Sequence, residues 1–312
     1  MDDLERAYVQ RLYRDEMLHW KVYKRLSDLE RNPKLRPILA KLAAIEEGHT
    51  GIWKRLLGPD AREPSAMRVG FMAGLIYASR LVLGLALTTK IIEYGENLLI
   101  RDLNRTLEML GKKRESAAIR RIEADMDRAE DPLKRSIIEH SPVLNNIRDV
   151  ILGANDGLVE ILAATAGLGI VLRNPLIVLL SGFIVAVAGT LSMAGGVYLS
   201  VEYEKSVGIV KTKSPLKGSA KTSALYVGLS YILGAMVPLV PFMFGLAGEW
   251  GVLGSVILTG IVLTFVSALI SIVSDTSIRA RIFRTLVISL GIAGVTVIIG
   301  TVARAVLHIP YT

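Results

Sequence analysis

Glu46 and His49 are the residues of this chain whose types and spacing most directly suggest chemistry. They stand three positions apart on a predicted helix and therefore share one face, which is the Glu-x-x-His spacing that carboxylate-bridged metal sites use in helix bundles. Glu16 lies about 16 residues before the break at Asn32, and Glu46 and His49 lie about 14 and 17 residues after it. In an antiparallel hairpin, these three side chains would share one level along the helix axes.

A second pair of acids, Glu93 and Glu96, is also three apart and precedes Gly111 by 15 to 18 residues. A ring of three carboxylates and an imidazole is a ligand set suited to Fe²⁺ or Mn²⁺. The alternative for each acid taken alone is a solvated charged face, because Glu-rich helices are common. For His19, three residues after Glu16, joining the ring and merely packing remain equally open.

Four helices are expected to position these side chains. Apolar residues recur at helical spacing, and the chain is punctuated by Asn32-Pro33, Gly58-Pro59 and Gly111. The predicted helices cover about 3–30, 33–57, 65–110 and 112–140, with Pro132 as a kink or early end of the last. We expect residues 1–140 to form a four-helix bundle with one longer crossover.

The stretch 69–87 within the third predicted helix is long and apolar enough to look like a membrane span. However, Arg80 lies at its centre, and Arg68 and Lys90 flank it. We expect this stretch to be buried at a bundle or dimer interface, or to lie against the membrane.

The chain changes character near residue 145. Mean hydropathy over the 312 residues is +0.44, but the charged residues are concentrated in the first half. Five apolar runs follow, each long enough for a span of about 20 residues: about 147–172, 175–201, 222–246, 250–273 and 283–307. The predicted fold is all-α, with a soluble bundle over 1–140 and a five-helix membrane domain over 145–312.

Loop charges predict the orientation in the cell membrane. The connections 202–221 and 274–284 are basic, so the positive-inside rule places them and the N-terminal bundle in the cytoplasm. No cleavable signal is expected at the N-terminus. The net charge of +8 comes without a nucleic-acid-binding motif, which argues against that class of partner. The lack of cysteine excludes disulfides and iron–sulfur centres.

Asp156 and Glu160 lie one helical turn apart inside the first apolar run. A carboxylate in a membrane span is expensive and indicates a functional site by default. The structural alternatives for Asp156 are a helix cap or a salt bridge with Arg148 or Arg304.

The run "IRDVILGANDGLVEILAATAGL", 147–168, resembles the first span of the vacuolar iron transporter-like family, whose signature is G-A-N-D-G-L-V. The segments 189–207 and 231–244 resemble its second and third spans. The resemblance implies a homodimer with a pore between the subunits, and exchange of Fe²⁺ for protons. It also implies that Asp156 is the pore acid and that Met193 supplies a thioether to the metal.

One departure from that family lies in the second predicted span, where Val197 stands in place of a glutamate that many members carry. This leaves Asp156, Glu160 and Glu202 as candidates to manage proton coupling. Glu202 could relay metal from the bundle or only balance Lys205, and both readings remain open.

Three segments of the soluble half resemble helices of a rubrerythrin-like, ferritin-like domain: 14–26, 42–57 and 90–99. This resemblance implies that Glu16, Glu46 and His49 are metal ligands. The fourth helix departs from the pattern, because Met126 and Ala129 stand where a second Glu-x-x-His would complete a di-iron site. The combination of the two domains resembles the membrane-bound ferritin branch of the vacuolar iron transporter-like family.

The function predicted from the sequence is export of Fe²⁺, or of Mn²⁺, from the cytoplasm in exchange for protons, with the bundle as a metal receptor. Such a protein would be a transporter rather than an enzyme, with at most weak ferroxidase activity. The alternative is a membrane-anchored, ferritin-like iron oxidase or iron store without transport.

Overall fold

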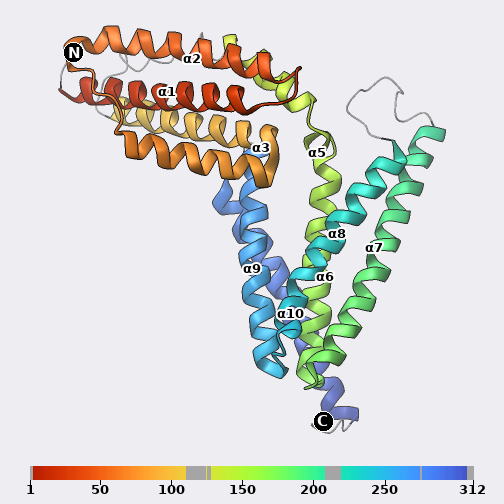
Figure 1. Cartoon of the computed structure of the whole chain (residues 1–312). Helices are drawn as coiled ribbons and strands as arrows, with labels where there is room; N and C mark the ends of the chain where they lie inside the picture. Colours follow the sequence, from red (N-terminus) through yellow and green to blue (C-terminus); the bar gives the residue numbers. More distant parts are fainter. Residues whose placement is uncertain (1–2, 110–123, 125–127, 208–218, 275, 308–312) are drawn as a thin grey trace. The chain divides into compact units, whose positions relative to one another are not determined.

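The computed structural model describes residues 3–109, 124, 128–207, 219–274 and 276–307 (Figure 1). The regular secondary structure of these residues is helical throughout, as predicted. Contacts within the chain divide it into two compact units, Met1–Leu144 and Asn145–Thr312, and the short helix α5 (Pro142–Asn145) crosses the division.

The first unit begins with a hairpin of α1 (Asp3–Leu29) and α2 (Arg36–Leu57). Pro37 lies in the first turn of α2, where a missing N–H costs nothing. Gly58 ends this helix with a φ of 61°, a conformation that glycine adopts without strain, and starts the 3₁₀ turn η1 (Gly58–Asp60). The two helices join through one apolar core: Val9, Leu12, Tyr13, Met17, Trp53 and Leu57.

Helix α3 (Ala66–Met109) is broken at Gly84, whose φ of 78° and ψ of 169° are not helical. The hydroxyls of Ser79 and Thr88 lie 3.1 Å apart, whereas residues nine apart in a continuous helix are separated by about 13.5 Å. The prediction of one continuous helix over 65–110 was therefore wrong, because the chain folds back at Gly84 into the two limbs drawn in orange and yellow in Figure 1.

The first unit also contains a helix at 128–139, which precedes α5. It runs through Pro132, so this proline does not end it. Met126, where the sequence analysis places a missing ligand, lies outside the described residues.

The second unit contains five helices that are long and apolar enough to cross a membrane. They are α6 (Ile147–Val171), α7 (Pro175–Ser206), α8 (Ala220–Met243), α9 (Gly248–Val273) and α10 (Ile278–Leu307). This agrees with the five predicted spans. Helix α6 contacts each of the other four, and α6 and α8 are the most buried of the five.

Close packing of α6 on α8 depends on two glycines of the G-A-N-D-G motif. A Cβ at Gly153 would overlap the carbonyl oxygen of Val227, and one at Gly157 would overlap the carbonyl oxygen of Tyr231. Small residues permit such approaches between membrane helices. The motif therefore sets how closely α8 lies against the segment of α6 that carries Asp156 and Glu160.

Candidate metal centre and membrane pocket

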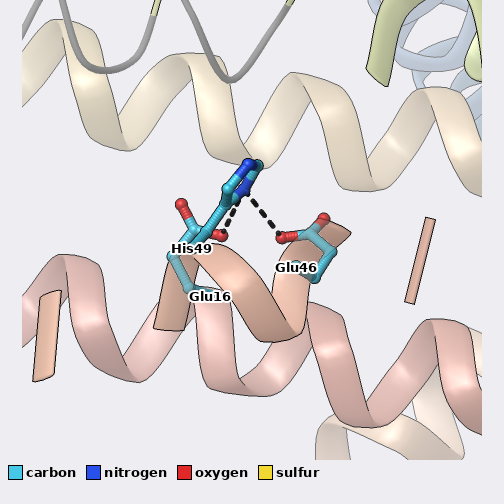
Figure 2. A group of neighbouring side chains, drawn as sticks. All are labelled: Glu16, Glu46 and His49. Carbon is cyan, nitrogen blue, oxygen red and sulfur yellow. Dashed lines mark ion pairs between the residues drawn. The ribbon is translucent and has the colours of Figure 1, made fainter. Parts of the chain in front are cut away.

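Glu16, Glu46 and His49 meet in the first unit, each of them buried. Glu16 comes from α1, and Glu46 and His49 come from successive turns of α2, so the hairpin brings them to one level (Figure 2). One ligand atom from each lies within 4.8 Å of the others. The His49 Nδ1 atom is 3.5 Å from Glu16 Oε2 and 3.8 Å from Glu46 Oε2.

The 128–139 helix adds Glu130, whose side chain is 1% exposed. Its Oε1 atom is 3.2 Å from His49 Nδ1, and its Oε2 atom is 2.7 Å from Nζ of Lys134. The same ammonium donates a hydrogen bond of 3.3 Å to Oε2 of Glu96 on the second limb of α3. Glu130 thus joins the imidazole on one side to the ammonium on the other.

Many oxygens of this cluster lack a hydrogen-bond donor. Both carboxylate oxygens of Glu46, Oε1 of Glu130 and Oε2 of Glu16 are buried without one among the described residues, whereas Oε2 of Glu130 is paired with the Lys134 ammonium. The contacts between the His49 ring and these acids are too long or too poorly aligned to count as hydrogen bonds. Buried carboxylates of this kind are normally paired or coordinate a metal. The three acids and the imidazole are therefore a donor set that fits a divalent cation such as Fe²⁺ or Mn²⁺.

The pKa values of the cluster reflect this crowding. Burial raises the pKa of Glu46 well above its ordinary value, and the neighbouring Glu16 raises it further. Burial would also raise the pKa of Glu16, but His49, Glu46 and His19 together outweigh it and lower the pKa to about 2. Burial would lower the pKa of His49, but Glu130, Glu16 and Glu46 raise it to about 11. A metal ion binding to the His49 imidazole would have to displace its proton.

The other ligands suggested by the sequence lie at different distances from this cluster. Glu96 reaches it through Lys134, whereas Glu93 is paired with Lys90 at 2.9 Å. His19 is buried, and its Nε2 atom lies 3.8 Å from Asp15. The Nδ1 atom of His19 has no hydrogen-bond partner among the described residues.

A pocket of about 580 Å³ lies in the second unit between α6, α7 and α8. Asp156 and Glu160 of α6 line one side, and Met193 of α7 lines another. Three of the four sequence-suggested residues of this half therefore border one cavity. Glu202, the fourth, is exposed further along α7 and does not line it.

Tyr231 of α8 also lines this pocket, and its hydroxyl donates a hydrogen bond of 2.7 Å to Glu160 Oε2. A Cβ at Gly189 of α7 would overlap the Tyr231 hydroxyl, so this glycine leaves room for the ring. Val197 also lines the pocket. It is the residue that stands where many members of the vacuolar iron transporter-like family carry a glutamate. The acids and the thioether therefore share the cavity with a phenol.

Sequence reasoning missed three residues of these two clusters. Glu130 was missed because the resemblance to the ferritin-like pattern placed the expected ligand at Ala129, the residue before it, which is exposed. Nothing in the sequence pattern indicated that Lys134 belongs to the site, because an ammonium group donates hydrogen bonds and is not a metal ligand. Tyr231 is 71 residues from Glu160, and only the tertiary fold brings them together.

Comparison with known proteins bears on the second unit. Residues 147–214 and 206–301 match the sequence profile of the VIT family. Vacuolar iron transporter homolog 3 of Arabidopsis thaliana is 34% identical over 131 residues, which is 39% of this chain and 62% of the relative. Vacuolar iron transporter homolog 4 of the same plant is 36% identical over 106 residues, or 31% of this chain and 54% of the relative.

A third relative, VIT-like transporter 1a of Glycine max, is 33% identical over 116 residues, covering 31% of this chain and 56% of the relative. The chain thus spans between 54% and 62% of the length of these three relatives. The matched stretch contains the G-A-N-D-G motif and the pocket of Asp156, Glu160 and Met193. The membrane unit of this chain, matched over residues 147–301, belongs to the VIT family.

Proposed function

We propose that this chain is a divalent metal transporter that exports Fe²⁺ from the cytoplasm in exchange for protons, with Mn²⁺ as the alternative cargo. The observation that carries the proposal is the pocket of Asp156, Glu160 and Met193 inside the VIT-family unit. Two plant relatives carry the name vacuolar iron transporter homolog, which supports the class of cargo.

The chemistry of the pocket suits a partly dehydrated transition-metal ion. Two carboxylates supply charge and hard oxygen ligands, while the thioether of Met193 adds a soft ligand that Ca²⁺ and Mg²⁺ do not favour. A carboxylate that is ionised can attract the cation, and one that takes up a proton releases it. Metal and proton would therefore compete for Asp156 and Glu160, and this competition is the proposed basis of exchange.

Tyr231 would set the role of Glu160 in this exchange. Its hydroxyl donates a hydrogen bond of 2.7 Å to one Glu160 oxygen and so fixes the position of this carboxylate. The second oxygen of Glu160 and the carboxylate of Asp156, one turn away on α6, remain for the cargo. We expect Tyr231 to orient Glu160 toward the cavity rather than to bind metal itself.

The first unit is proposed as a ferritin-like receptor that faces the cytoplasm. The cluster of Glu16, Glu46, His49 and Glu130 would bind the metal and raise its local concentration near the transporter. The basic loops 202–221 and 274–284 support the orientation through the positive-inside rule. A homodimer is proposed from the resemblance to the family.

Transport is tested with the full chain reconstituted in liposomes that contain a metal-quenched dye. We expect Mn²⁺ and Fe²⁺ to quench the dye in wild-type vesicles, and Asp156→Asn to abolish the quenching. Glu249→Gln is the matched control, since Glu249 is an exposed acid in the first turn of α9, outside the pocket. Equal flux in wild type and Asp156→Asn would overturn the assignment of the pocket.

A second candidate function is a membrane-anchored iron oxidase or store. The observation that favours it is the buried, carboxylate-rich cluster of the first unit, since oxidation of Fe²⁺ in helix bundles uses such ligands. Oxygen consumption after addition of Fe²⁺ separates the two functions. Rapid consumption by the full chain, without metal flux in vesicles, would favour the oxidase.

A further inference from the structure

Lys134 is an unusual residue to find beside a candidate metal centre. Its side chain is 4% exposed, and burying an ammonium is costly unless it is paired and hydrogen-bonded. The pairing is provided by two carboxylates from different helices, with Nζ 2.7 Å from Glu130 Oε2 and 3.3 Å from Glu96 Oε2. Lys134 is therefore built into the cluster.

Glu130 divides its two oxygens between two positive groups. Its Oε1 atom faces His49 at 3.2 Å, on the side of Glu16 and Glu46, while its Oε2 atom faces Lys134. A carboxylate that bridges two metal ions in a helix bundle directs one oxygen to each ion. Here the ammonium stands where the second ion of such a pair would be, between Glu130 and Glu96.

We propose that Lys134 is a built-in cation that fills the second metal position, so that the centre binds a single divalent ion through Glu16, Glu46, His49 and Glu130. This proposal deepens the receptor role given to the first unit and rests on it. Two-metal chemistry is then excluded by a side chain of the protein itself, and the centre is suited to binding and release of one ion.

The charges of the cluster agree with one ion. Four carboxylates belong to it: those of Glu16, Glu46 and Glu130, which are buried, and that of Glu96, which is 14% exposed. With the ammonium of Lys134 and one divalent cation, a single net negative charge remains. A second divalent cation would make the buried cluster net positive, and it would have to occupy the space from which the ammonium contacts Glu130 and Glu96.

The proposal is tested by counting Mn²⁺ in the full chain in detergent. Asp156→Asn with Glu160→Gln serves as the background, so that the membrane pocket does not contribute ions. We expect one Mn²⁺ per chain by elemental analysis and an uncoupled six-line electron paramagnetic resonance spectrum. Lys134→Met should raise the count from one to two and produce the spectrum of a spin-coupled pair.

Two lysine variants serve as controls. Lys134→Arg keeps the positive charge, and Lys90→Met removes a lysine that pairs with Glu93 outside the cluster. We expect both to bind one ion, like the background protein.

Two bound, spin-coupled ions in the background protein would overturn the proposal, whether or not Lys134→Met folds. A folded Lys134→Met protein that still binds one ion would overturn it as well. In either case the first unit would remain a metal receptor. Absence of any bound Mn²⁺ in the background protein would instead overturn the receptor role on which the proposal rests.

Discussion

Glu46→Gln should change the stability of the first unit in opposite directions with and without metal. Glu46 is fully buried, and neither carboxylate oxygen has a hydrogen-bond partner among the described residues. Leaving a buried polar group unsatisfied costs about 1–3 kcal/mol, and more when the group is charged. Glutamine keeps the shape of the side chain and removes the charge, so the metal-free protein should become more stable by about that amount.

The expected change in stability corresponds to a measurable change in melting temperature. One kcal/mol shifts the melting temperature of a domain of roughly 150 residues by about 2–4 °C, so Glu46→Gln should raise that of the metal-free first unit by about 2–12 °C. In the wild type, Mn²⁺ at a hundred times its Kd should add about 2.7 kcal/mol of stability. The variant should lose this metal-induced increase, because a ligand is missing.

The pH dependence of this effect follows from the pKa of Glu46. A carboxyl whose folded pKa lies above its unfolded value of 4.5 holds its proton more tightly in the folded state. Its contribution to stability is therefore lost as the pH rises from 4.5 through the folded pKa. The gain in stability of metal-free Glu46→Gln over the wild type should be greatest at alkaline pH and should vanish below pH 4.5.

The assay is thermal unfolding of the full chain followed by tryptophan fluorescence, to which Trp53, buried in the core of the first unit, contributes. Glu47→Gln is the matched control, because Glu47 is the next residue on α2 but is exposed, and it should leave both melting temperatures unchanged. The reasoning would be refuted by a Glu46→Gln protein that is less stable without metal, or by one that keeps the full Mn²⁺-induced increase.

Two other perturbations give clear expectations. Gly157→Ala should lower the stability of the membrane unit by about 1–3 kcal/mol, because the new Cβ would overlap the carbonyl oxygen of Tyr231. Gly260→Ala is the control and should leave this stability unchanged, because the space around its Cβ is open. Equal melting temperatures for the two variants would argue against the close packing of α6 on α8. The affinity of the His49 centre for Mn²⁺ should rise about tenfold per pH unit below a pKa of about 11, because binding displaces one proton; a flat profile by equilibrium titration would show that His49 is not a ligand.

Local sequence rules predicted the helices that position both clusters. Asn32-Pro33 and Gly58-Pro59 punctuate the chain strongly, so counting residues from the first break placed Glu16 level with Glu46 and His49. Long apolar runs identified the five spans within a few residues of their observed ends.

The misses arose where tertiary structure decides the outcome. Gly84 lies in an apolar run that reads as helix, and nothing local indicates that the chain folds back there. Lys134 and Glu130 meet Glu96 and His49 through the packing of separate helices. Tyr231 reaches Glu160 because glycines of α6 admit α8 so closely.

Paired recording of metal and proton movement in the same liposomes tests the central claim most directly. Wild-type vesicles given an inward Mn²⁺ gradient should take up metal and release protons in a fixed ratio, and a proton gradient of opposite sense should drive metal uphill. Asp156→Asn should show neither movement. Metal uptake without proton release in the wild type, or both movements intact in Asp156→Asn, would contradict exchange through this pocket.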